Sequence, residues 1–253
     1  MNRYRIKWAS ALIGLALMGV GFSTSHASGL SLYEATYTTK VMGIKVTLNR
    51  SLTRDEDRFH LSQAGKTFLL KLNEDSHFSL SGNQIVGEEF VYQLGGVSNR
   101  RREVLFDQQN GTIRSLKKEE WTEHPWSPDV LDRLSQQEQM RLKLLGSETP
   151  PERISLSIID GPRIKLKHFD LVETGTLDTS VGTLNTVHYT LRHDDPSERS
   201  SDAWLATDHR RFSSAIYGQS PDDDLTGTKQ VQDCVEGSLG RFYARGKVTP
   251  RCP

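Results

Sequence analysis

The chain has 253 residues with 32 basic and 32 acidic side chains, and 35% of its residues are hydrophobic. That length suits one large domain or two small ones. The balanced charge argues against a protein that binds nucleic acid through bulk positive charge, and because only one stretch is apolar enough to enter a bilayer, a polytopic membrane protein is excluded.

The N-terminal segment has the three-part pattern of a secretory signal. Residues 1–7 carry three basic side chains and no acid, residues 8–22 are uncharged, and Ser25-His26-Ala27 offers small residues at both positions that a signal peptidase reads. An uncleaved anchor is the alternative, although the apolar run is short for a span of about 20 residues. We expect a signal peptide over residues 1–27, cleavage after Ala27, a periplasmic protein and no integral membrane span in the mature chain.

Alternation of apolar and polar residues predicts β-strands along the first part of the mature chain. The predicted strands are Tyr33–Thr38, Ile44–Asn49, Phe59–Leu72 with a break at Gly65, Phe78–Leu80, Phe90–Tyr92, Val104–Phe106 and Thr112–Ile113. Residues 107–111 between the last two form a hairpin turn. Short polar turns about every ten residues favour an antiparallel meander.

The pattern changes at Ser127-Pro128, which predicts the start of a helix. Serine is a good N-cap, proline is favoured at the first helical position, and Asp129 suits the first turn. Gly146 is placed to end the helix. A helix near residues 128–145 is therefore expected between two sets of strands, with a polar middle at Gln136 to Gln139.

Alternation returns after Pro150-Pro151. The predicted strands of this second set are Ile154–Ile158, Ile164–Val172, Leu177–Thr179, Leu184–Leu191, Ala203–Ala206 and Ser213–Tyr217. We therefore predict a mainly β (α+β) fold over residues 28–220. Its core would be a strongly curled antiparallel sheet or open β-barrel, with the one helix inserted between the two strand sets.

The remaining segment, residues 221–253, is a polar tail that holds both cysteines, Cys234 and Cys252. In an oxidising compartment a disulfide between them is the expected state. It would close a loop of about 19 residues and stabilise the tail by roughly 3 kcal/mol. A redox or metal pair is disfavoured because there is no CxxC spacing and no histidine between the two cysteines.

Several stretches in this order resemble DUF3108, a family of exported bacterial domains of unknown function. They are Tyr37 to Leu48, Val130 to Ser135, Ile159 to Arg163, Leu177 to Leu184 and Asp202 to Asp208, within a resemblance over roughly Tyr33 to Tyr217. The resemblance implies a periplasmic, mostly β domain, and some curled sheets of the family are similar to those of lipoprotein carriers. The family supplies no catalytic residues to carry over.

No motif in the sequence supports a catalytic, cofactor or metal site. Gly65-Lys66-Thr67 ends like a phosphate-binding loop but lacks its first glycine and lies in a strand pattern. No HExxH or paired-histidine helix is present. Glu88-Glu89 and similar neighbouring carboxylates are expected to point to opposite faces of a strand, so they would not form one acid–base pair. The sequence thus leaves enzymatic activity uncertain and leans against it.

Amphipathic and basic side chains on the predicted strands are the candidates for ligand binding. Aromatic residues near a sheet mouth can line a groove for an acyl chain or a sugar face, and an inward arginine or histidine can bind a head group. The alternative for each is a core or solvent-facing role. The candidates are Tyr37, Tyr92, Trp121, Trp126, Arg163, His188 and Trp204.

Two classes of function compete on this basis, and a third stays open. The favoured one is a periplasmic, non-catalytic binding or assembly factor for a cell-envelope component: a lipid-like molecule, a glycan or an outer-membrane partner protein. The second is a hydrolase or lyase of envelope polysaccharide, whose sign would be a polar cleft with two carboxylates at catalytic separation. The third is a structural scaffold, which would show a large exposed apolar patch.

Overall fold

The computed structural model describes residues 30–41, 44–96, 99–179, 182–192, 201–207, 215–219 and 232–235. The predicted leader, residues 1–27, lies outside these ranges, and so does Cys252. Cleavage after Ala27 and the disulfide to Cys234 therefore stay predictions. No helix in the described ranges is long and apolar enough to cross a bilayer.

The first sheet has nine strands in the order β15-β1-β2-β3-β4-β5-β6-β7-β8, so β1 to β8 follow chain order and form the predicted antiparallel meander. β15 joins it at the edge, where Cys234 lies opposite Ala35. The strands are β1 (Tyr33–Val41), β2 (Ile44–Asp55), β3 (Arg58–Lys66), β4 (Leu70–Ser81), β5 (Gln84–Gly96), β6 (Arg100–Asp107), β7 (Thr112–Lys117), β8 (Glu120–Pro125) and β15 (Gln232–Val235).

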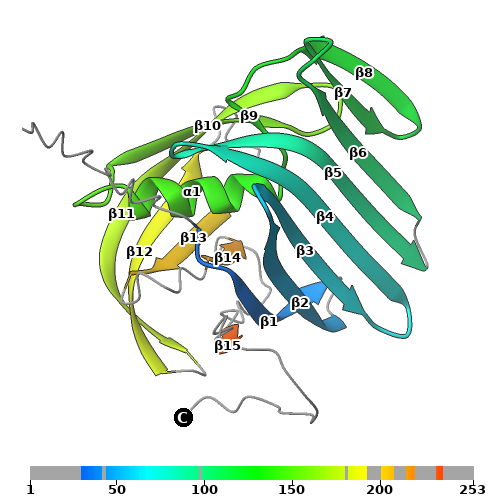
Figure 1. Cartoon of the computed structure of the whole chain (residues 1–253). Helices are drawn as coiled ribbons and strands as arrows, with labels where there is room; N and C mark the ends of the chain where they lie inside the picture. The colour runs from blue at the N-terminus through cyan, green and yellow to red at the C-terminus, as the bar shows by residue number, and fades with distance from the viewer. Residues whose placement is uncertain are drawn as a thin grey trace, which may run out of the picture.

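The second sheet has six strands in the order β14-β13-β12-β11-β10-β9. They are β9 (Val130–Leu131), β10 (Arg153–Ile159), β11 (Ile164–Thr179), β12 (Gly182–Arg192), β13 (Ser201–Ala206) and β14 (Ala215–Gln219). Figure 1 shows the two sheets curving around the single described helix, α1 (Ser135–Leu145), as a half-barrel. The predicted fold class, mainly β with a curled sheet and one helix between two strand sets, is confirmed.

The predicted start of the helix, at residue 128 with Ser127 as its cap, is wrong. Val130 and Leu131 are fully or almost fully buried and pair in parallel with β10, so this apolar pair extends the second sheet instead. The chain becomes helical only after Asp132, whose carboxylate accepts the N–H groups of Leu134 and Ser135 and thereby satisfies the orphan donors of a first turn.

The predicted strand over Phe59–Leu72, with its break at Gly65, is also wrong, because the chain does not continue in the same direction after the break but reverses between Lys66 and Leu70. β3 ends at Lys66, and the hydroxyl of Thr67 accepts hydrogen bonds from the N–H groups of Leu69 and Leu70 at 3.2 and 3.0 Å. The resulting turn starts β4 at Leu70 and leaves Phe68 89% exposed. A side chain that caps its own turn competes with strand extension, and alternation alone does not reveal this.

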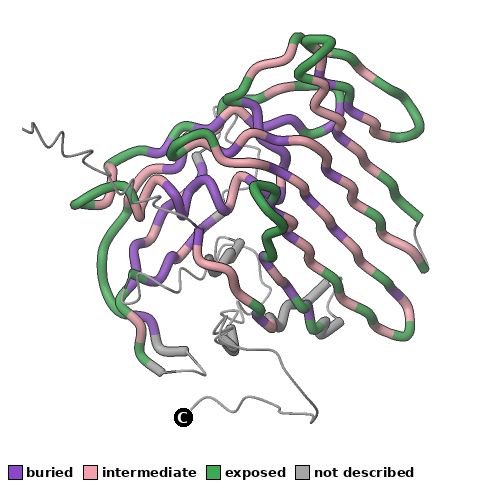
Figure 2. The backbone as a smooth tube through the Cα atoms, in the orientation of Figure 1, coloured by how far each residue is buried: buried purple, intermediate pink, exposed green. Residues whose placement is uncertain are grey.

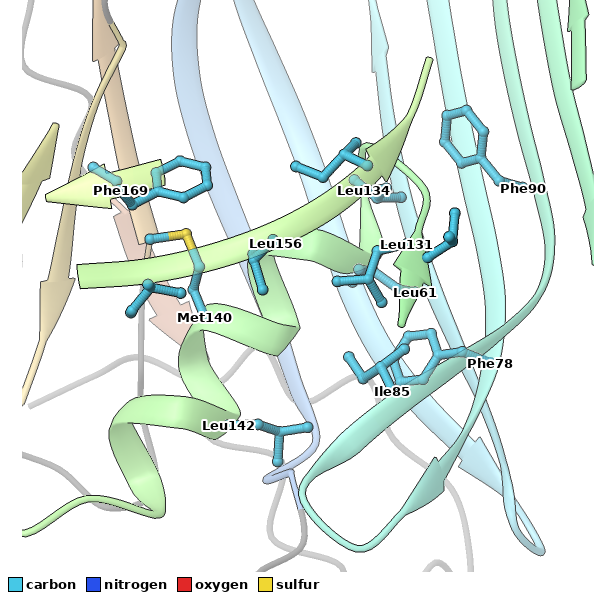
Figure 3. Packing of buried hydrophobic residues seen from close by; sticks show 14 of the residues in the cluster. Leu61, Phe78, Ile85, Phe90, Leu131, Leu134, Met140, Leu142, Leu156 and Phe169 are labelled. Carbon is cyan, nitrogen blue, oxygen red and sulfur yellow. The ribbon is translucent and has the colours of Figure 1, made fainter. Parts of the chain in front are cut away.

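The core lies where both sheets meet α1. Phe78 and Phe90 enter it from the first sheet, Leu156 and Phe169 from the second, and Met140 from the helix, as Figure 3 shows. Figure 2 shows many buried residues near this junction, while the far end of the nine-stranded sheet is mostly half-buried or exposed. A second small cluster of buried residues, Ala35 and Leu48, lies in β1 and β2. The core therefore fixes one end of the half-barrel.

Candidate functional site

Polar side chains cross the nine-stranded sheet in a single register row, on the face that is turned toward α1 and is called here the inner face. Each member lies directly opposite the next on the neighbouring strand. This polar row consists of Arg50, Gln63, Glu74, Tyr92, Arg102 and Lys117. Cross-strand neighbours on one face contact one another, so the row brings residues from six strands into one line.

One end of the polar row forms a buried ion network with α1. Glu138 accepts hydrogen bonds from Arg50 Nη2 at 3.0 Å and from Arg141 Nη1 at 2.8 Å, and the Tyr33 hydroxyl donates to it at 2.6 Å. Arg50, Glu138 and Arg141 are at most 5% exposed. Burial alone would raise the pKa of Glu138, but Arg141, Arg50 and the Tyr33 hydrogen bond outweigh it and lower that pKa. The network joins the helix to the sheet.

The middle of the row holds a carboxyl group that is less well satisfied. Glu74 is 5% exposed, and its Oε2 accepts a hydrogen bond from Gln63 at 3.1 Å. Its Oε1 has no hydrogen-bond partner among the described residues and lies 3.5 Å from Arg133 Nε. Burial raises the pKa of Glu74, against the opposing effect of Arg133 and Arg50. This carboxyl therefore destabilises the folded state when it ionises.

We expect Glu74→Gln to stabilise the protein at neutral pH by on the order of 1 kcal/mol. The folded state holds the Glu74 proton more tightly than the unfolded chain, so stability is lost as pH rises from 4.5 through the raised pKa. Glutamine cannot ionise, so the Glu74→Gln variant does not lose this stability as the pH rises. Urea unfolding of both proteins at neutral pH and below pH 4.5 checks this: the gain must disappear in acid, and an equal gain at both pH values would contradict the assignment.

A recess lies on the outer side of the nine-stranded sheet, where β5 and β6 part. Their pairing runs from Leu94 opposite Arg100 to Glu89 opposite Leu105 and goes no further. Beyond that pair lies an open groove of about 840 Å³. Its lining is Arg58, Ser79, Val86, Gly87, Glu88, Glu89, Leu105, Phe106, Asp107, Gln108 and Gln109.

A β-bulge brings two neighbouring carboxylates into this groove. His77 of β4 lies opposite Glu89 and Phe78 lies opposite Gly87, so Glu88 is the extra residue on β5. The bulge suspends strict alternation, and both Glu88 and Glu89 line the groove. The sequence-based expectation that this pair points to opposite faces is therefore wrong.

Three charged groups of the groove, Arg58, Glu88 and Asp107, have local partners. Arg58 Nε lies 2.6 Å from Glu88 Oε2. Asp107 accepts hydrogen bonds from the backbone and side-chain nitrogens of Asn110, which lower the pKa of Asp107. The ring of Phe106 lies against Gly87, where a Cβ atom would come within 2.8 Å of it. The groove thus combines fixed carboxylates, amides and one aromatic ring.

The predicted ligand-binding residues lie in several separate parts of the fold. Tyr92 lies in the polar row, with the guanidinium groups of Arg102 and Arg133 5.7 and 5.2 Å from its ring centroid. His188 stacks on Trp204 with centroids 4.3 Å apart and contacts Asp202 at 3.1 Å.

The other four candidates lie apart from these two places. Trp121 is 42% exposed and lies under Arg114, and Trp126 packs against the core. Arg163 is exposed in the turn that precedes β11. Tyr37 is in β1, but its side chain lies outside the described residues. Tyr92 is thus the only described candidate in the polar row, and none of the six whose side chains are described lines the groove.

Sequence reasoning missed Arg50, Glu138, Asp132 and the groove residues. The one sequence signal was the polar stretch Gln136 to Gln139, which contains Glu138. A polar helix face usually indicates solvent, so this stretch identified neither Arg50 nor Asp132. Among the described residues no group of three or more metal-binding side chains is positioned to hold a metal ion.

Comparison with known proteins gives one match. The family described as protein of unknown function (DUF3108) matches residues 32–218, which is most of the chain. No curated protein and no solved structure matches. The match covers the eight-stranded meander from β1 to β8, the helix and the second sheet through β13, so the chain belongs to the DUF3108 family.

Proposed function

We propose that this chain is an exported, non-catalytic binding or assembly factor for a cell-envelope component, and that the component is a glycan segment held in the groove between β5 and β6. The groove carries the proposal. Its volume of about 840 Å³ lies within the range of ligand sites. Export rests on the three-part N-terminal pattern of residues 1–27.

The groove chemistry favours a polyhydroxylated ligand over an acyl chain. Glu88, Glu89 and Asp107 offer acceptors, and Arg58 and Gln108 offer donors, around the ring of Phe106. Sugar hydroxyl groups both donate and accept, so they can satisfy such a lining. An acyl chain would leave these polar groups desolvated without partners, which is costly.

The arrangement of carboxyl groups argues against a hydrolase. A glycosidase needs one carboxylic acid with a raised pKa beside a second carboxylate. Burial raises the pKa of Glu74 and of Asp132, and both lie buried beside α1, outside the groove. In the groove, Glu88 is paired with Arg58 and the pKa of Asp107 is lowered. The groove is therefore suited to binding.

The test is native mass spectrometry of the full chain, purified from the periplasm and mixed with oligosaccharides released from the envelope. We expect a non-covalent complex, and Glu89→Gln with Gln108→Ala should weaken it about tenfold because hydrogen bonds to a charged group are lost. Glu123→Gln with Gln93→Ala removes similar exposed groups from outside the groove and should leave binding unchanged. The protein mass itself reports cleavage after Ala27.

Three outcomes would overturn the proposal. Shortened oligosaccharides that disappear with the Glu89→Gln variant would make the protein a hydrolase. If every oligosaccharide fraction gave only the mass of the bare protein, the ligand would not be a glycan. If a lipid mass were found on the purified protein, the ligand would be the lipid-like molecule instead.

A further inference from the structure

Basic residues occur in the sequence beside three turns at one end of the nine-stranded sheet, those that follow β1, β3 and β5. Because the strands are antiparallel and in chain order, the β1–β2, β3–β4 and β5–β6 turns lie at the same end, the lower end in Figure 1. Residues 36–49, 63–72 and 93–102 contain no aspartate or glutamate. The basic residues in these segments are Lys40, Lys45, Lys66, Lys71, Arg100, Arg101 and Arg102.

The β3–β4 turn presents an aromatic side chain to solvent at this end. Phe68 is 89% exposed, the highest value among the exposed large hydrophobic residues of the described chain. Thr67 holds the turn in shape through its hydroxyl, and the backbone N–H of Thr67 donates to the carbonyl of Leu70 at 2.8 Å. Gly96 of the next hairpin approaches the Leu69 carbonyl so closely that a Cβ atom would clash at 2.0 Å. Phe68 is therefore exposed from a well-defined turn.

The lysines beside Phe68 form an unfavourable pair in the isolated protein. Lys66 and Lys71 lie directly opposite each other on β3 and β4, and both are exposed. Like charges in this position are destabilising. Neither lysine has an ion-pair partner among the described residues, and exposed Arg100 has none there either. An external anion would relieve this repulsion.

The other end of the sheet has the opposite character. The β2–β3 turn contains Asp55, Glu56 and Asp57, and the β6–β7 turn begins with Asp107. The three basic segments with the exposed aromatic ring thus lie at one end of the sheet. The acidic turns lie at the other end, near the groove, where Arg54 pairs with Asp57 and Arg58 with Glu88. Such a charge separation orients a molecule on a charged surface.

We propose that the Phe68 end of the sheet docks on the surface of an anionic lipid bilayer. Phe68 enters the interface, and Lys66, Lys71 and Arg100 lie at the headgroup phosphates. A polyanionic polysaccharide could bind the cations but would not bury an exposed phenyl ring. The headgroup region of an anionic bilayer can bind the cations and bury the ring. Docked in this way, the protein keeps the groove, at the acidic end, away from the membrane.

The test is co-sedimentation of the full mature chain with vesicles of phosphatidylcholine alone or mixed with phosphatidylglycerol. We expect binding only to the mixed vesicles, weakening as salt is added. Phe68→Ser should weaken it about tenfold, and each of Lys66→Gln and Lys71→Gln about fivefold. The controls are Leu166→Ser, at a 60% exposed leucine of β11, and Arg54→Gln, at an exposed arginine beside the β2–β3 turn at the opposite end of the sheet. Both should bind like the parent protein, and circular dichroism confirms that every variant is folded.

Three results would overturn the proposal. The first is no binding to mixed vesicles at low salt. The second is binding that the lysine variants weaken but Phe68→Ser leaves unchanged, which would indicate attraction to any polyanion; retention on dextran sulfate with the same pattern would confirm that reading. The third is a loss of vesicle binding in the control variants as large as that in the Phe68 and lysine variants. Glycan binding in the groove is measured separately and does not depend on this outcome.

Discussion

Glu138→Ala is expected to destabilise the protein by about 3–5 kcal/mol, because it leaves two buried guanidinium groups without their shared carboxylate. Arg50 and Arg141 are 5% and 3% exposed, and both contact Glu138 within 3.0 Å. The two arginines come from different elements, β2 and α1, so the loss also loosens the helix from the sheet. Urea unfolding at neutral pH measures the effect, and Tm should fall by about 10 °C.

Acidification supplies an internal check on this prediction. The pKa of Glu138 is lowered in the folded state from its ordinary value of 4.5, so its contribution is present above that value and is lost as pH falls through the lowered pKa. The difference in unfolding free energy between the parent protein and Glu138→Ala should therefore become smaller in acid. Asp57→Ala, which breaks the exposed pair with Arg54, should barely change stability. A similar loss in both variants would contradict a special role for the buried network.

Asp132→Ala is expected to lower the free energy of unfolding by about 2–4 kcal/mol, because it removes a helix cap and leaves two buried hydroxyl groups without their acceptor. Asp132 is 0% exposed. Its Oδ1 accepts the N–H groups of Leu134 and Ser135 at 2.7 and 2.8 Å, and its Oδ2 accepts the hydroxyls of Ser76 and Ser135 at 2.8 and 2.7 Å. One side chain thus ties the helix start to β4.

Asp132→Asn is the matched control. Its carbonyl oxygen keeps both backbone hydrogen bonds, and the Ser76 and Ser135 hydroxyls can rotate to accept from its amide group. Burial raises the pKa of Asp132, so the charge itself adds little, and we expect a loss below about 1 kcal/mol. Thermal unfolding of the two variants compares them directly. An asparagine variant as unstable as the alanine variant would show that charge, and not acceptor geometry, holds the helix start.

Period-two alternation was sufficient to predict most strands, because a sheet with one buried face imposes it directly on the sequence. β10 is an example, with Ile154, Leu156 and Ile158 buried. It was insufficient where local hydrogen bonding or register intervened. Thr67 turned a predicted strand into a hairpin, and the bulge at Glu88 placed two adjacent carboxylates in one groove.

The buried ion network could not have been predicted from spacing. Arg50 and Glu138 are 88 positions apart, and nothing near either residue identifies the other. The polar stretch Gln136 to Gln139 was visible in the sequence, but a polar helix face usually indicates solvent. Here Gln139 is fully buried. Its side-chain oxygen accepts a hydrogen bond from the backbone N–H of Ile85, and its side-chain nitrogen donates one to the backbone carbonyl of Asn83. Only the curvature of the sheet around α1 turns that stretch inward.

The buried polarity of α1 also constrains how the chain folds. The helix has 11 residues, and its buried positions include Ser135, Glu138, Gln139 and Arg141. So short a helix is marginal in water, and it has no broad apolar face with which to join an early hydrophobic collapse. Its hydrogen-bonding partners exist only after β2, β4 and β5 have assembled. We therefore expect the sequence-local hairpins of the meander to close first, and α1 to dock late and join the two sheets into one cooperative unit.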